Sequence, residues 1–257
     1  MRYVKVHRSK YVKGKATVKK EAKIMEKTVS ISNEVKELDI HISYGELNIE
    51  DGEEFKVELE WSGDNELFLE EENGRLRIWN EREDKRIPIS KKHSDIMRVN
   101  VTIPQEQTFE KVRIVSGAGT LYVGRLWSES VVVRLGAGEV QIGDLKASNF
   151  AHIEKGAGAI EIENGEIHNL KLDVGVGEVG VNAILTGTAQ INAGVGELRL
   201  NLLGDAEDYN VIVKRGFGNS MINGCDWRNG NTYGAGANHV ELNGGMGLIS
   251  VTFEEYV

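Results

Sequence analysis

A Gly-x-Gly motif recurs along the second half of this chain at a nearly constant spacing, and it constrains the fold more than any other feature. Copies begin at Gly117, Gly136, Gly156, Gly175, Gly194, Gly216 and Gly245, so the first glycines are separated by 19, 20, 19, 19, 22 and 29 residues. A period of about 20 residues is typical of solenoids, in which each repeat stacks on its neighbour. The sequence therefore predicts a stack of similar coils, each lying on the one before it in the chain.

Side chains on both sides of each motif alternate between aliphatic and mixed positions. Aliphatic residues stand two and four places after the second glycine, as in Val140/Ile142, Ile160/Ile162 and Leu198/Leu200. A second aliphatic pair precedes most motifs, as in Val131/Val133 and Leu170/Leu172. Strands with one buried face require this alternation, so each coil is expected to contribute about four inward side chains.

Composition narrows the class further. Glycine is abundant at 30 of 257 residues and proline rare at 2, which fits repeated tight turns and argues against a disordered linker protein. The net charge of −9 disfavours a general nucleic-acid binder, because phosphate contacts need a basic surface. No transmembrane segment or export signal is visible, which predicts a cytoplasmic chain as written; the alternative is the cell envelope or surface if the native chain is longer.

The chain divides into three predicted parts. Residues 1–27 form a basic N-terminal arm, with nine Lys or Arg against one acid in residues 1–24. This arm is expected either to be a solvated tail or to touch an anionic surface such as lipid headgroups. Residues 28–111 are predicted to be an irregular β region that caps the solenoid, and residues 112–257 to be the regular coils.

Two details extend this division. Gly45-Glu46-Leu47-Asn48-Ile49 has the same form as Gly138-Glu139-Val140-Gln141-Ile142, so a degenerate repeat is expected within the irregular region. The last repeat interval is longer by roughly ten residues, which places an insertion at Asn229–Asn238. We expect this insertion to protrude from the stack as a loop.

These motifs resemble the bacterial putative adhesin family, whose members are β-solenoid domains of largely unknown function. The resemblance covers about residues 28 to 253. It depends on Asp39-Ile40-His41-Ile42-Ser43-Tyr44-Gly45, on Val99-Asn100-Val101-Thr102-Ile103-Pro104, and on the serial Gly-x-Gly-Glu-aliphatic coils. The resemblance implies a β-solenoid fold and a frequent association with the cell envelope.

Candidate partner-binding residues are aromatic or polar side chains at outward or corner positions: Tyr122, Trp127, Asn229, Asn231 and Tyr233. Aromatic side chains there could stack on a glycan or a protein partner, although Trp127 and Trp227 could equally fill the core at corners. Cys225, the single cysteine, cannot form an intrachain disulfide and is expected to be a small buried residue.

The residue pattern gives little support for a catalytic, cofactor or metal site. Glu178 and Glu197 occupy equivalent positions 19 residues apart, so their carboxylates should lie one strand spacing apart, about 4.8 Å. Calcium could hold such a pair, but Arg199 could neutralise it instead, leaving a solvated surface. We therefore predict no catalytic residues, no cofactor and no metal ligand.

The favoured function is a non-enzymatic binding or scaffold module, adhesin-like and associated with the envelope, whose partner is an unknown protein or glycan. One alternative is a structural protein that assembles end to end through unpaired terminal strands. A carbohydrate-active β-helix enzyme is the remaining alternative, and it ranks last because the aligned columns show no cluster of acids across one groove.

Overall fold

The computed structural model describes residues 23–63, 66–80 and 96–254. Within these residues every regular element is a strand, apart from one 3-10 turn, η1 (Ala206–Asp208). The predicted all-β class is therefore confirmed. Most of the basic arm, and with it the expected contact with an anionic surface, lies outside the described residues. Strand β1 begins at Ile24, within the range predicted to be arm.

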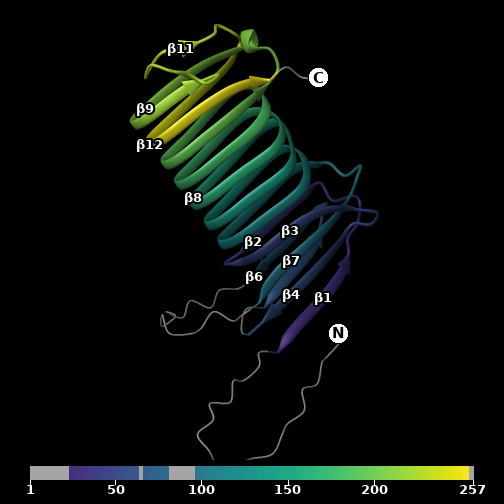
Figure 1. Cartoon of the computed structure of the whole chain (residues 1–257). Coiled ribbons are helices and arrows are strands. Elements are labelled where there is room, and N and C mark those ends of the chain that lie inside the picture. The colour runs from purple at the N-terminus through teal and green to yellow at the C-terminus, as the bar shows by residue number, and fades with distance from the viewer. Residues whose placement is uncertain (1–22, 64–65, 81–95, 255–257) are drawn as a thin grey trace, which may run out of the picture.

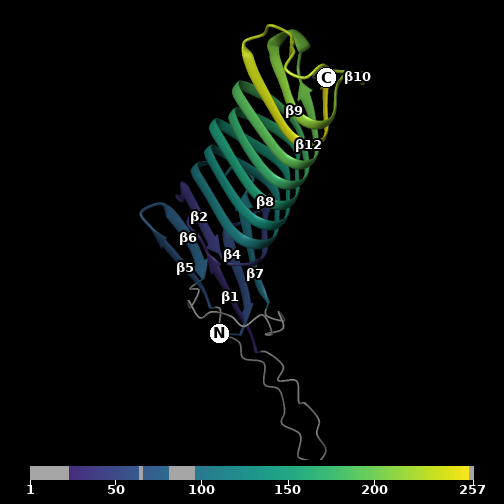
Figure 2. The same ribbon diagram turned by 90° about the vertical axis from the view of Figure 1, so that its left-hand side faces the viewer.

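Seven short strands build one end of the molecule (Figure 2). They are β1 (Ile24–Ser30), β2 (Glu37–Ile42), β3 (Gly45–Gly52), β4 (Lys56–Ser62), β5 (Leu67–Glu72), β6 (Arg75–Asn80) and β7 (Met97–Pro104). Parallel pairing joins β2 to β6 and β3 to β7, whereas β1, β4 and β5 add antiparallel strands outside them. The sheet order on this side ends at β1.

The degenerate repeat at Gly45 does occupy a coil position. β2 and β3 pair in parallel with the first coil of β8 (Phe109–Leu203), with Leu38 opposite Val112 and Gly45 opposite Gly119. Gly45 therefore lies at the same turn as the second glycine of the first regular motif. The similarity of the two sequence segments reflects this shared place in the stack.

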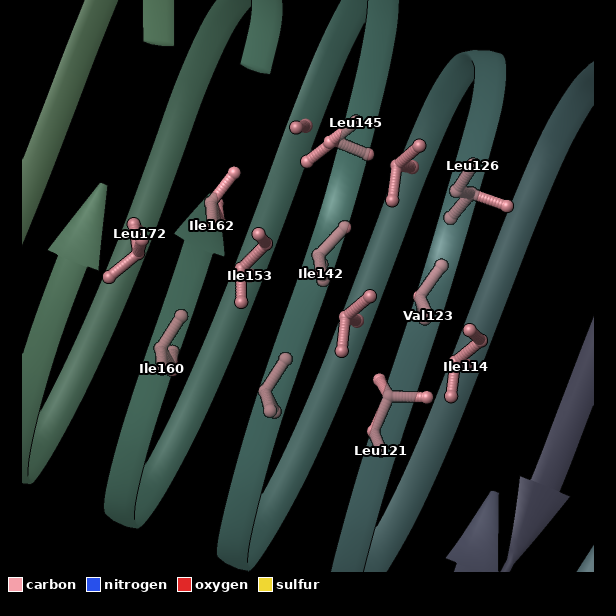
Figure 3. Packing of buried hydrophobic residues seen from close by; sticks show 14 of the residues in the cluster. Ile114, Leu121, Val123, Leu126, Ile142, Leu145, Ile153, Ile160, Ile162 and Leu172 are labelled. Carbon is pink, nitrogen blue, oxygen red and sulfur yellow. The ribbon is translucent and has the colours of Figure 1, made fainter. Parts of the chain in front are cut away.

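β8 is a continuous segment of 95 residues that winds through the middle of the stack (Figure 1). Side-chain hydrogen bonds connect adjacent coils by joining residues that are 19 apart in the sequence. Asn182 Nδ2 donates to the Glu163 carbonyl at 2.8 Å, and Asn192 Nδ2 donates to Asp173 Oδ1 at 2.6 Å. The predicted inward column of Val140, Ile160, Val179 and Leu198 is at most 2% exposed. Figure 3 shows the neighbouring column, in which Val123, Ile142 and Ile162 follow one another along the core.

Glycine is required where each coil turns sharply. At Gly138 and Gly177 the backbone has φ values of +126° and +146°, which L side chains rarely adopt. A Cβ added at Gly177 would overlap the carbonyl oxygen of Gly158 in the coil below. Glycine is therefore required in the motif for two reasons, the unusual backbone angle and the close approach of adjacent coils.

The last two coils do not stack in chain order. β12 (Asn238–Glu254) lies between β8 and β9 (Tyr209–Ile222) and runs parallel to both, so that Gly247 pairs with Gly196 on one side and Gly218 on the other (Figure 1). The predicted serial order is wrong here. The 29-residue interval gives the chain enough length to return past β9, and the inserted strand then pairs along both of its edges.

The insertion at Asn229–Asn238 does not protrude as predicted. It belongs to a segment with two short strands, β10 (Cys225–Asp226) and β11 (Thr232–Tyr233), which pair antiparallel with β9. Backbone amides of Trp227 and Gly230 donate to carbonyls of β9 at 2.7 and 2.8 Å. The segment thus covers part of the outer edge of the terminal strand, which would otherwise offer unpaired backbone groups to another chain.

Candidate binding surface

The middle residues of the Gly-x-Gly motifs form a row along one edge of the stack, which we term the glycine-turn edge. Its members become larger and more apolar toward the β9 end. In spatial order they are Ala118, Ala137, Ala157, Val176, Val195, Met246 and Phe217. The last four are 54, 45, 55 and 77% exposed, respectively. The coils therefore hold their largest outward apolar side chains at one end of one edge.

The four exposed side chains are direct neighbours. Met246 pairs in register with Val195 on one side and with Phe217 on the other, and Val176 lies one coil below Val195. Among the described residues, seven large hydrophobic side chains are exposed, and four of them lie in this row. Their combined exposed surface is roughly 400 Å², within the size range of functional patches on monomeric proteins.

One flank of the edge carries an open groove of about 570 Å³. Lys214, Arg215 and three asparagines, Asn192, Asn229 and Asn243, line it together with the bare backbone of the glycine turns. Lys214 is neutralised, because its Nζ lies 3.0 Å from Glu241 Oε2. A hydrogen bond from Asn243, reinforced by Lys214, holds the pKa of the Glu241 carboxyl below its usual value. This ion pair therefore persists as the solution is acidified into the ordinary range of a carboxyl pKa.

Arg215 differs from Lys214 because its described partners are neutral. Its Nε donates to Ser220 Oγ at 3.0 Å, and its Nη1 donates to the Gly218 carbonyl. The guanidinium group thus folds over the turn that carries Phe217. A positive charge and the most exposed aromatic ring of the edge are held beside each other.

On the opposite flank, the side chains change from acidic to neutral along the edge. Beside Val176 and Val195 it carries Glu178 and Glu197, whereas the equivalent positions beside Met246 and Phe217 hold Leu248 and Asn219. The end of the edge with the largest apolar residues therefore has neutral neighbours on this flank and a cation on the other.

Arg199 forms ion pairs with both of the glutamates that were candidates for calcium. Its Nη1 lies 3.1 Å from Glu197 Oε1, and its Nη2 lies 3.7 Å from Glu178 Oε2. The hydrogen bond to Glu197 is the main cause of a raised pKa for the Arg199 guanidinium. In the part of the chain that the structure describes, no group of three or more His, Cys, Asp or Glu side chains is arranged to hold a metal ion.

Two of the sequence-predicted partner residues, Trp127 and Tyr122, belong to the first coil of β8, away from the apolar end of the glycine-turn edge. Trp127 is half-buried, and its Nε1 donates to Asp144 Oδ2 at 2.6 Å. The Arg125 guanidinium carbon and Lys146 Nζ lie 4.6 and 4.8 Å from the centre of its ring. Trp127 therefore lies outside the hydrophobic core and is already engaged by cations. Tyr122 is 41% exposed and pairs with Asn48 in the strand below.

The remaining predicted residues belong to the cover over β9. Asn229 Oδ1 accepts from the Arg215 amide at 2.9 Å, and its Nδ2 donates to the Arg215 carbonyl at 3.0 Å. This side chain therefore makes the two hydrogen bonds that the backbone of a neighbouring strand would make to Arg215. The Asn231 carbonyl accepts from Trp227 Nε1 at 3.2 Å. Tyr233 stacks on Phe253 with ring centroids 5.1 Å apart. These contacts are structural, although Asn229 also lines the groove.

The structure corrects one prediction and adds a surface that the sequence analysis did not identify. Cys225 is exposed, so the prediction of a buried cysteine is wrong, because the segment lies on the outside of β9 where little packs over it. The glycine-turn edge itself was missed. Its signal was present in the sequence as the increase from Ala157 through Val176 to Phe217, but its full extent depends on the spatial order of the last two coils.

The described residues contain no helix long and apolar enough to span a membrane. Comparison with curated proteins gives no match. Among solved structures, a putative cell adhesion protein from Clostridium sporogenes is 17% identical with a TM-score of 0.40, covering 91% of this chain and 100% of its own. A putative adhesin from Bacteroides fragilis is 12% identical with a TM-score of 0.37, covering 89% of this chain and 97% of its own.

A putative adhesin from Parabacteroides distasonis gives the same identity and TM-score, covering 90% of this chain and 98% of its own. Those names describe those proteins, and identities this low carry no inference about what this chain binds. A family model is more informative, because it matches residues 33–216, more than half of the 257 residues. The match ends one residue before Phe217, so the apolar end of the edge extends beyond it. The chain belongs to the Toastrack DUF4097 family.

Proposed function

We propose that this chain is a non-enzymatic, adhesin-like binding module in which a β-solenoid of 19 to 20 residues per coil holds the glycine-turn edge rigidly toward a partner. The observation that carries the proposal is the contiguous exposed row from Val176 to Phe217. The largest apolar patch on a monomeric protein is usually of about this size and is often functional. Rigid glycine turns reduce the entropy lost on binding, since little conformational freedom remains to be frozen.

We further propose that the partner lies at the cell envelope. The test compares the full chain with a Phe217→Ser/Met246→Ser variant for binding to isolated bacterial membrane and wall fractions. Phe150→Ser serves as the matched control, because Phe150 is an exposed aromatic residue that lies outside the edge. The proposal predicts that the double variant loses binding while the control retains it. Equal binding by all three proteins would refute the edge as the binding surface.

The two alternatives have less support. End-to-end assembly would need a free terminal strand, yet the segment with β10 and β11 covers part of β9, and β1 carries Glu26 and Lys27, charges of the kind that block edge pairing. A carbohydrate-active enzyme would need acids clustered across one groove, whereas two acids of one outward column are held in ion pairs, Glu154 with Arg134 at 3.1 Å and Asp173 with Lys171 at 3.5 Å.

A further inference from the structure

We infer that the apolar end of the glycine-turn edge docks on an anionic lipid surface, with Phe217 and Met246 entering the layer just below the headgroups. This inference deepens the proposed function, because it rests on the edge being the binding surface and names the chemistry of the partner. Three properties of the edge lead to it: its shape, its area and its charge.

Shape and area distinguish a lipid partner from a protein partner. The four exposed residues occupy successive coils, so the row is about 14 Å long at about 4.8 Å per strand, and it is one residue wide. Its apolar surface of roughly 400 Å² is about half of the 800 Å² that each partner contributes to a standard protein interface. A narrow row of this kind suits lipid headgroups, which move apart around an inserted side chain, better than a second copy of this chain.

The charge pattern favours anionic lipid. The Arg215 guanidinium lies beside Phe217 and is bound to neutral oxygens, so its positive charge is available to a phosphate group. On the other flank, Leu248 and Asn219 replace the glutamates that stand beside Val176 and Val195. Binding of a protein surface to anionic membranes grows with the apolar area that enters the lipid and with the attraction of nearby cations, and this end of the edge offers both.

The depth of insertion is limited by the turns themselves. Lys214 and Glu241 form their ion pair beside the same groove, and burying that pair in hydrocarbon would be unfavourable. Only the tips of the edge are therefore expected to leave water. Binding should be reversible and should weaken as salt screens the attraction of Arg215 to lipid phosphates.

The experiment uses the single exposed cysteine as an advantage. In the full chain, Cys225→Ser is combined with Phe217→Cys, and the new thiol carries an environment-sensitive fluorophore. The matched control places the same fluorophore in Cys225→Ser/Phe150→Cys. Both proteins are mixed with vesicles of phosphatidylcholine alone and of phosphatidylcholine with phosphatidylglycerol. The inference predicts a blue-shifted, brighter emission at position 217 only, with the phosphatidylglycerol vesicles only, and its reversal by salt.

Vesicle sedimentation of unlabelled protein gives the second readout. Phe217→Ser/Met246→Ser should bind phosphatidylglycerol vesicles about tenfold more weakly or worse, because two buried apolar side chains are lost, whereas Phe150→Ser should bind as the wild type does. The basic arm could itself bring the protein to the vesicles. Sedimentation with an unchanged signal at position 217 would therefore overturn the inference.

The outcomes also separate this inference from the proposed function. The fluorophore at position 217 could show no change in emission with lipid while the Phe217→Ser/Met246→Ser variant still loses binding to envelope fractions. In that case the edge binds something other than lipid, and only the present inference fails. If the variant keeps full binding to both vesicles and fractions, both fail.

Discussion

Replacing Gly177 by alanine tests the close approach of the coils directly. Gly177 has φ +146°, and a Cβ there would overlap the Gly158 carbonyl oxygen in the neighbouring coil. A non-glycine residue in such a backbone conformation costs about 1 to 3 kcal/mol. Forcing the packed neighbour aside costs about 1 to 3 kcal/mol more. The change should therefore destabilise the protein by about 2 to 6 kcal/mol.

The matched control is Val176→Ala in the same turn. Val176 is 54% exposed, so its truncation should change the free energy of unfolding by no more than about 0.5 kcal/mol. For a chain of this size, about 2 to 4 °C of Tm corresponds to each kcal/mol, so the glycine variant should melt about 4 to 24 °C below wild type. Thermal unfolding followed by circular dichroism measures both variants. Equal Tm values for the two would show that the coils do not approach as closely as described.

Three further predictions concern the C-terminal coils and the paired glutamates. Tyr209→Phe removes a buried hydroxyl that donates to the Leu203 carbonyl at 2.8 Å, so unfolding should become easier by about 1 kcal/mol. Burial raises the pKa of Tyr209 above its ordinary value of 10.0. The free energy of unfolding of the wild type, measured by denaturant titration, should therefore fall as pH rises through and above about 10, and this part of the fall should be absent from the variant. Asn229→Ala uncovers the backbone of Arg215 and should produce concentration-dependent association in sedimentation velocity; a variant that stays monomeric would show that the cover is dispensable. Arg199→Ala leaves two adjacent carboxylates without their cation, so millimolar calcium should raise its Tm but not that of the wild type.

The interior of the coils could be predicted because it depends on local periodicity. Alternation around each motif identified Val140, Ile160, Val179 and Leu198 as one inward column, and all four are buried. The similarity of the Gly45 segment to the repeat motif predicted a coil position for Gly45, and the structure pairs Gly45 with Gly119. Each of these inferences needs only the spacing of residues along the strand, which the sequence states directly.

The order of the coils could not be predicted in the same way. A stack that runs Gly194, Gly216, Gly245 and one that runs Gly194, Gly245, Gly216 bury the same aliphatic columns and have the same sequence period. Only the longer last interval hinted at a return of the chain. The choice depends on long-range pairing that periodicity does not encode.

The candidate surface was missed for the same reason. The sequence alone shows each outward residue only within its own coil, which favours aromatic side chains such as Trp127 as candidates. Its surroundings, Arg125 and Lys146, become known only when the register of neighbouring coils is fixed. Likewise, Met246 and Phe217 become a continuation of Val195 only once β12 is inserted between β8 and β9.

Cysteine cross-linking in a Cys225→Ser background tests that insertion most directly. Neighbouring strands lie about 4.8 Å apart and strands two apart about 9.6 Å. Disulfides need Cα atoms within about 7 Å. Val195→Cys/Met246→Cys should therefore form an intramolecular disulfide under mild oxidation, and Val195→Cys/Phe217→Cys should not. Cross-linking of the 195–217 pair in place of the 195–246 pair would show that the coils stack in chain order and would contradict both the fold and the continuous edge built on it.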